Sequence, residues 1–196
     1  MHPMRRRRSL APVVLGLAVA LAGCAAEPSP EPSVSQPAPP QEAAVEWVEP
    51  APTPTEGAVS ASRLVFEVRT IAVTEAGWRT DVAIRNESDI AWEIDETVPS
   101  RFGVMLFASG ELDELEQRNA DRTLPGLRPA REFDPPLPPR LEPGATWEGT
   151  LAAPGALAAE RYLRVVFGPL FADGDPPQGL PPQLVWITDN AYRLRP

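Results

Sequence analysis

Hydrophobic and polar residues alternate along the chain between residues 64 and 94. A period of two places successive side chains on opposite faces, so the pattern predicts strands with one buried face. The polar turns Glu75–Gly77 and Asn86–Asp89 divide this stretch into three strands, and the first two form a predicted hairpin with its charges facing solvent. The apolar positions are Leu64, Phe66, Val68, Ile71, Val73, Trp78, Val82, Ile84, Ile90, Trp92 and Ile94.

The remainder of the chain continues in the same structural class. Residues 102–107 form a continuous apolar run, which is typical of a central strand buried on both faces. Leu112 and Leu115 fall on one helical face, so a short helix is predicted within residues 111–118. The Pro-rich stretch 125–143 favours a connector along a sheet edge. Further strands are expected at 146–151, 162–167, 184–187 and 192–194. Strands at short intervals with Gly or Pro between them predict an all-β sandwich over residues 62–196.

The N-terminal segment has the layout of an export signal. Four arginines, Arg5 to Arg8, precede a 14-residue apolar stretch from Leu10 to Gly23. A membrane-spanning helix needs about 20 residues, so this stretch is too short to span a bilayer and is predicted to be part of a signal peptide, residues 1–23. Arg7-Arg8-Ser9-Leu10 is similar to a twin-arginine export motif, although a generic basic segment is the favoured interpretation.

The end of this segment, Leu21-Ala22-Gly23-Cys24, resembles the lipobox of bacterial lipoproteins at all four positions. The resemblance implies that the Cys24 thiol receives a diacylglyceryl group and that a lipoprotein signal peptidase recognises Leu21, Ala22 and Gly23 and cuts before Cys24. Two acyl chains are enough for stable anchoring. The expected location is therefore extracytoplasmic, with the chain lipid-anchored to the bacterial cell membrane. The alternative is an ordinary signal peptide with an incidental Cys.

Residues 24–61 differ sharply in composition from the rest of the chain. Residues 25–61 hold nine Pro and six Glu but no Arg. Pro denies the backbone its regular hydrogen bonds, and few apolar residues are present to offset the entropy of ordering. These residues are therefore predicted to form the lipidated Cys24 and a disordered linker with a reach on the order of 100 Å.

An apolar island, Ala43–Val48, interrupts this linker and contains Trp47. A disordered linker has no need of Trp, so the island is interpreted either as a strand added to a sheet edge or as a partner-binding element. The remaining alternative is an incidental exposed Trp. Trp47 is the one partner-binding residue that the sequence suggests.

Composition excludes most catalytic chemistry. All 18 basic residues are Arg, the single His is His2, and the single Cys is Cys24. Cleavage before Cys24 removes His2 and lipidation consumes the thiol, which leaves no nucleophile–His or Ser–Lys pair and no ordinary zinc or copper ligand. The mature chain would carry 27 acids against 14 Arg, a net charge of −13 that argues against nucleic acids. We therefore expect no enzyme, no cofactor and no resident metal site.

Calcium is the one metal whose preferred ligands are abundant. Asp173-Gly174-Asp175 forms an acidic turn, and residues 111–116 hold four acids. Neither spacing matches a calcium loop, so a surface turn and a solvated helix face are the simpler interpretations.

Turn and strand motifs in the body carry a second resemblance. These are Gly77-Trp78, Asn86-Glu87-Ser88-Asp89, Leu141-Glu142-Pro143-Gly144 and Thr146-Trp147-Glu148-Gly149. Residues 62–170 resemble the telokin-like, immunoglobulin-fold domains of unknown function found in bacterial surface lipoproteins. The resemblance implies an immunoglobulin-like β-sandwich. That family has no established catalytic residues, so it assigns none here.

Two functions fit these observations. The first is a non-catalytic, lipid-anchored interaction module of the cell envelope, which binds an envelope protein or a glycan. The alternative is a lipoprotein that captures calcium, a glycan or a small molecule. A concave apolar pocket would favour the second, and an exposed patch or sheet edge the first.

Overall fold

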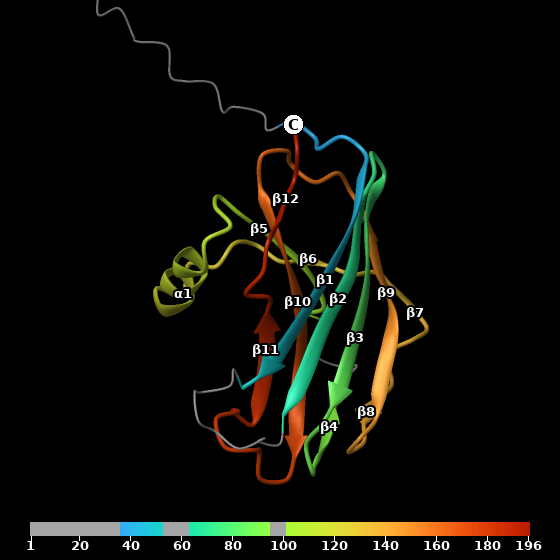
Figure 1. The fold of residues 1–196 in the computed structure, drawn as a ribbon, viewed down its shortest axis with the longest axis vertical. Helices are drawn as coiled ribbons and strands as arrows, with labels where there is room; N and C mark the ends of the chain where they lie inside the picture. Colours follow the sequence, from blue (N-terminus) through green and yellow to red (C-terminus); the bar gives the residue numbers. More distant parts are fainter. Residues whose placement is uncertain (1–35, 53–62, 95–100) are drawn as a thin grey trace, which may run out of the picture. The chain divides into compact units, whose positions relative to one another are not determined.

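The computed structural model describes residues 36–52, 63–94 and 101–196 (Figure 1). Nearly all of the regular structure is antiparallel β, with one short helix. The strands are β1 Gln41–Ala51, β2 Leu64–Val73, β3 Gly77–Asn86, β4 Ala91–Glu93, β5 Gly103–Phe107, β6 Arg128–Pro129, β7 Glu132–Asp134, β8 Arg140–Leu141, β9 Thr146–Pro154, β10 Tyr162–Asp173, β11 Gln183–Ile187 and β12 Tyr192–Arg193, and the helix is α1 Leu112–Ala120.

The strands form two antiparallel sheets. The first has the order β1-β2-β3-β9-β7, with β1 and β7 at its edges. The second is built around β10, which pairs with β5 through its first half and with β4 through its last residues. β11 and β12 pair along the other side of β10, and β6 and β8 extend the sheet from β5 and β4.

The core lies between the two sheets. Phe66 of the first sheet meets Phe167 of the second with ring centroids 4.9 Å apart, and Phe102 lies edge-on to Phe167. Trp92 is completely buried, Trp78 and Trp147 are buried as well, and Trp186 packs against the core. The predicted all-β sandwich is thereby confirmed, as are the hairpin, the strand at 103–107 and the short helix.

The buried pattern of β2 changes phase in the middle of the strand. Leu64, Phe66 and Val68 face the core, and then the odd-numbered Ile71 and Val73 do. The register against β3 shifts by one residue at this point, because residue 69 is extra on β2. A β-bulge of this kind lets one strand keep its apolar side chains inward after an odd insertion.

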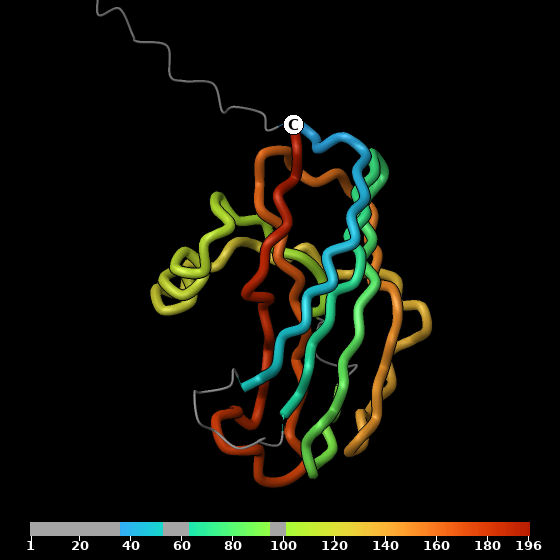
Figure 2. The backbone as a smooth tube through the Cα atoms, viewed as in Figure 1, coloured from blue at the N-terminus to red at the C-terminus, as the bar shows by residue number. Residues whose placement is uncertain are grey.

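The prediction of a disordered linker over residues 24–61 is wrong for residues 41–51. These residues form β1, which pairs antiparallel with β2 along its whole length, and Figure 2 shows β1 running beside the C-terminal strands. The chain is already tied to the body at Ala38, whose N–H donates to the carbonyl of Leu157 at 2.7 Å. The Pro residues lie before residue 41 and from residue 50 onward, so within β1 only Pro50, opposite Val65 near the end of the strand, lacks a backbone N–H.

The Pro-rich stretch 125–143 lies at sheet edges, as predicted. Its strands β6, β7 and β8 are two or three residues long, and each ends a sheet. The predictions for Leu21, Ala22, Gly23 and Cys24, and for residues 53–62, fall outside the described residues.

Candidate functional site

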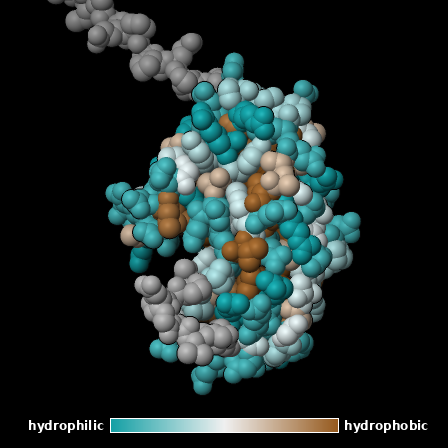
Figure 3. Space-filling view, in the orientation of Figure 1, coloured by the Kyte–Doolittle hydropathy of each residue, from teal (hydrophilic) through white to brown (hydrophobic). Residues whose placement is uncertain are grey.

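The apolar island of the N-terminal segment forms the middle of the edge strand β1. Trp47 lies opposite Val68 of β2, is half-buried and packs against the core. Its neighbour Val48 faces outward and is 58% exposed. On the face shown in the space-filling view, hydrophobic patches follow the course of β1 and mark α1 (Figure 3). The interpretation of the island as an added edge strand is confirmed, and partner binding through Trp47 stays a prediction.

A second bulge distorts β1 next to the bulge of β2. The β1–β2 register shifts between Ala44 and Trp47, and Glu46 adopts a left-handed conformation with a φ of 49°. The two bulges open a shallow hollow of about 380 Å³ on the outer surface. Its lining consists of Ala44, Glu46, Trp47, Val48, Glu67, Arg69 and Thr70.

The charges on the outer face of β2, β3 and β9 neutralise one another. Arg69 pairs with Glu148 at 2.8 Å and with Glu67 at 3.2 Å, and Arg85 joins Glu67 at 3.0 Å. The chain of alternating charges continues through Glu87 to Arg63. By contrast, the exposed Glu42 and Glu46 of β1 make no hydrogen bond or ion pair with the described part of the chain. The edge strand therefore carries two carboxylates that lack a direct ion-pair partner among the described residues.

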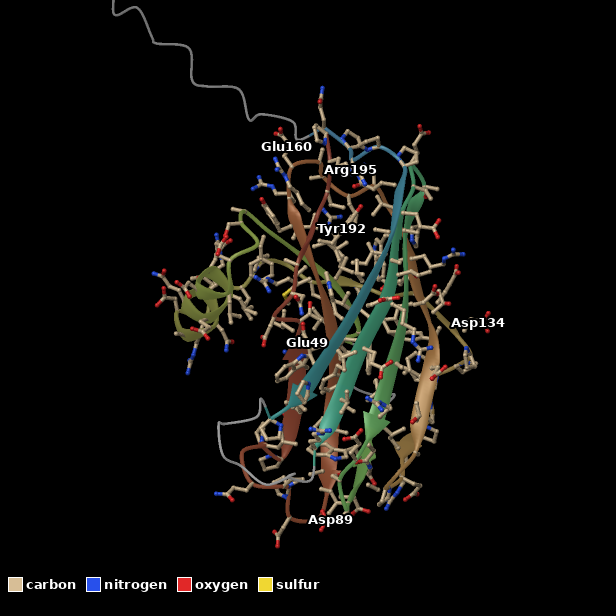
Figure 4. All side chains as sticks on the ribbon, in the orientation of Figure 1. Glu49, Asp89, Asp134, Glu160, Tyr192 and Arg195 are labelled. Carbon is tan, nitrogen blue, oxygen red and sulfur yellow. The ribbon has the colours of Figure 1, made fainter. Side chains whose placement is uncertain are left out.

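A single buried carboxylate fastens β1 to the opposite sheet. Glu49 is 5% exposed and points from β1 toward β11, where Figure 4 labels it. Its Oε2 accepts hydrogen bonds from Trp186 Nε1 at 2.9 Å and from the Asp189 N–H at 2.8 Å. Its Oε1 accepts the N–H and the side-chain amide of Asn190 at 2.9 and 2.8 Å. Four donors meet one carboxylate, so its negative charge is fully hydrogen-bonded inside the protein.

The buried Arg164 contacts the segment 188–190, which Glu49 also binds, from its other side. Arg164 of β10 is fully buried and donates to the carbonyls of Thr188 and Asp189, and also to those of Gly110 and Glu111 before α1. Burial lowers the pKa of Arg164, opposed by surrounding carboxylates. Burial also raises the pKa of the Asp189 carboxyl, and the charge of Glu49 adds to this effect. The peptide groups of residues 188–190 thus separate a buried anion from a buried cation.

Sequence reasoning missed this arrangement. Glu49 lies in the segment predicted as linker, and its partners are 137 to 141 residues away along the chain. Arg164 interrupts an otherwise apolar run of β10. A charged residue within such a run is the one sequence signal from which a buried, hydrogen-bonded arginine could have been predicted.

A second open groove crosses the outer face of the first sheet beside the β2–β3 hairpin. Its volume is about 460 Å³. Strand register places Glu42, Ala72, Arg79, Ala152 and Glu132 in one row across five strands. The small alanines leave the guanidinium of Arg79 standing between two carboxylates, and within the described residues it has no ion-pair partner.

One acid in each of the two acidic clusters with possible calcium ligands pairs with an arginine. Asp173 pairs with Arg140 at 2.5 Å. Glu114 pairs with Arg118 at 2.7 Å and accepts the N–H of Ser109. Burial raises the pKa of Glu114, but these hydrogen bonds outweigh it and the net shift is downward. Across the described ranges, no group of three or more His, Cys, Asp or Glu is placed to hold a metal ion.

Comparisons with protein-family models, curated proteins and solved structures found no match to this chain. In the described part of the chain, no helix has the length and hydropathy to cross a membrane.

Proposed function

We propose that this protein is a non-catalytic, lipid-anchored lipoprotein of the bacterial cell envelope whose immunoglobulin-like β-sandwich binds a partner protein through the β1 edge. The observation that carries the proposal is the exposed edge itself. β1 is eleven residues long, pairs among the described strands with β2 alone, and exposes Val48 beside the half-buried Trp47. Long edges are normally blunted or covered, so one that combines length with an exposed apolar residue is typical of an interaction site.

The anchor follows from the lipobox, and mass spectrometry of the membrane fraction tests it. We expect the N-terminal peptide to begin at Cys24 and to carry the mass of a diacylglyceryl group. The Cys24→Ser variant should lose both the modification and the membrane attachment. A soluble product that begins at another residue would contradict the anchor.

Site-specific photo-crosslinking tests the interaction edge. A photoreactive amino acid replaces Val48 on β1, and a matched variant carries it at Glu132 on β7, the other edge of the same sheet. Both positions are exposed. We expect a discrete cross-linked envelope protein from position 48 and none from position 132. Equal products at both positions, or none at position 48, would contradict an interaction through β1.

A ligand-binding lipoprotein is the second candidate, and the groove beside the β2–β3 hairpin favours it. Arg79 suits a carboxylate, and the flanking Glu42 and Glu132 suit a cationic group, so the groove matches a small zwitterion. Titration with amino acids and short peptides tests this function. Binding that the Arg79→Ala variant abolishes would favour it, and an absence of saturable binding would exclude it.

A further inference from the structure

The backbone of β1 offers one side for a further strand. An antiparallel strand directs about half of its N–H and C=O groups toward each neighbour. Within the described residues, no hydrogen bond joins a backbone group of residues 41–51 to any element other than β2. At the opposite edge, β7 is three residues long and offers little backbone. β1 is therefore the edge of this sheet with the length to accept another strand.

The side chains at this edge suit a long basic side chain. The hollow beside the bulge is lined by Val48 and Trp47, which would contact an aliphatic stem. Glu46 lies at the same hollow and has no partner of its own among the described residues. An Arg or Lys lays its stem on apolar surface while its charged head meets a carboxylate or an aromatic face.

Charge distinguishes between the possible occupants of the edge. Glu42 and Glu46 have no direct ion pair with the described part of the chain, whereas Glu67, Glu87 and Glu148 on the adjoining sheet face each pair with an arginine. A second copy of this chain, paired through its own β1, would bring the same two acids to the contact. Like charges across a strand pair are destabilising, and opposite charges stabilise.

We infer that β1 binds an extended segment of a partner protein, by strand addition, in which Arg or Lys alternates with apolar residues. This inference rests on the proposed function and names the chemistry of its partner. The backbone ladder supplies the binding energy. Glu42 and Glu46 select the basic side chains, and the hollow at the bulge receives one of them beside Val48.

A designed peptide probes this inference with the full lipidated chain in a non-ionic detergent. The peptide has nine residues in which Arg alternates with Val and Thr, and it carries a fluorescent label for anisotropy measurements. One comparison peptide has Glu in place of every Arg. A second keeps the Arg residues but is methylated on every backbone nitrogen, which removes the donors that strand addition requires.

We expect saturable binding of the basic peptide alone. The Glu42→Arg/Glu46→Arg double variant should weaken it at least about tenfold, whereas the single Glu132→Arg variant on β7 should change it less than about twofold. Equal binding of the methylated peptide would overturn strand addition, because attraction to an acidic protein would then be sufficient. No binding of the basic peptide, or equal loss in the Glu132→Arg variant, would also overturn the inference.

The cross-linking experiment separates this inference from the function on which it rests. If position 48 captures a discrete envelope protein but the basic peptide does not bind, the interaction module stands and the basic strand partner is wrong. If position 48 captures nothing and the peptide does not bind, both the proposed interaction through β1 and the basic strand partner are wrong.

Discussion

Replacing Glu49 with Gln tests whether this carboxylate fastens the edge strand to the opposite sheet. A carboxylate accepts at both oxygens, whereas a glutamine side chain accepts at its carbonyl oxygen and only donates at its NH2 group. Each oxygen of Glu49 receives two of the four hydrogen bonds, so either orientation of the glutamine side chain sets its NH2 group against two donors. At about 1–2 kcal/mol for each buried donor left unsatisfied, Glu49→Gln should lower the free energy of unfolding by about 2–4 kcal/mol.

Urea unfolding, followed by tryptophan fluorescence, measures this loss. Glu42→Gln is the matched control, because Glu42 lies on the same strand, is exposed, and has no partner among the described residues. The control should stay within about 0.5 kcal/mol of the unaltered protein. Hydrogen exchange should show the largest loss of protection in the amides of β1 and residues 186–190. If both variants unfold at the same urea concentration, the four bonds do not hold β1 and the reasoning is wrong.

Substitutions at three further sites, Asp189, Gly77 and Glu46, have defined outcomes. Because burial raises the pKa of Asp189, ionisation of this carboxyl above its ordinary pKa of about 3.9 destabilises the fold. Asp189→Asn should therefore be more stable at pH 7, by less than about 1 kcal/mol after solvent screening, and the gain should vanish at pH 3 in thermal unfolding. A Cβ at Gly77 would lie 2.2 Å from the carbonyl oxygen of Ala153, so Gly77→Ala should cost about 1–3 kcal/mol in urea unfolding. Gly126→Ala, whose Cβ would meet nothing within 4 Å, should cost less than about 0.5 kcal/mol. Glu46→Gly should raise the melting temperature because the left-handed conformation costs a non-glycine residue roughly 1 kcal/mol, and Glu46→Val should lower it. A bulge without strain would leave both melting temperatures unchanged.

Much of the sandwich was predictable because the alternation of apolar and polar residues within a strand shows which of its faces is buried. The alternation over residues 64–85 is set by one buried face, and even the bulge at residue 69 is visible as a change from even to odd apolar positions. The helix at α1 followed from two leucines on one face. Such features depend on neighbours along the chain, and periodicity reports them directly.

The edge strand and its fastening were not predictable in the same way. Prolines on both sides of residues 41–51 dominate the composition of the segment and hide a short strand within it. The tie at Glu49 depends on donors that folding brings from the far end of the chain. A contact of this separation has no local signature, so the sequence showed a glutamate in a linker where the fold has a buried acceptor.

Incorporation of β1 into the sandwich changes how the proposed anchor would limit the search for a partner. Eleven residues lie between Cys24 and Gln36, which is the first of the described residues and accepts a hydrogen bond from the N–H of Ala159 in the body. Even fully extended at about 3.1 Å per residue, they reach roughly 35 Å, about a third of what a linker to residue 61 would allow. The volume available to the anchored domain scales with the cube of this length, so it shrinks by more than about tenfold and the local concentration of a partner in the same membrane rises accordingly. For a binding edge of modest affinity, this higher local concentration would raise the fraction of bound partner without any additional contacts.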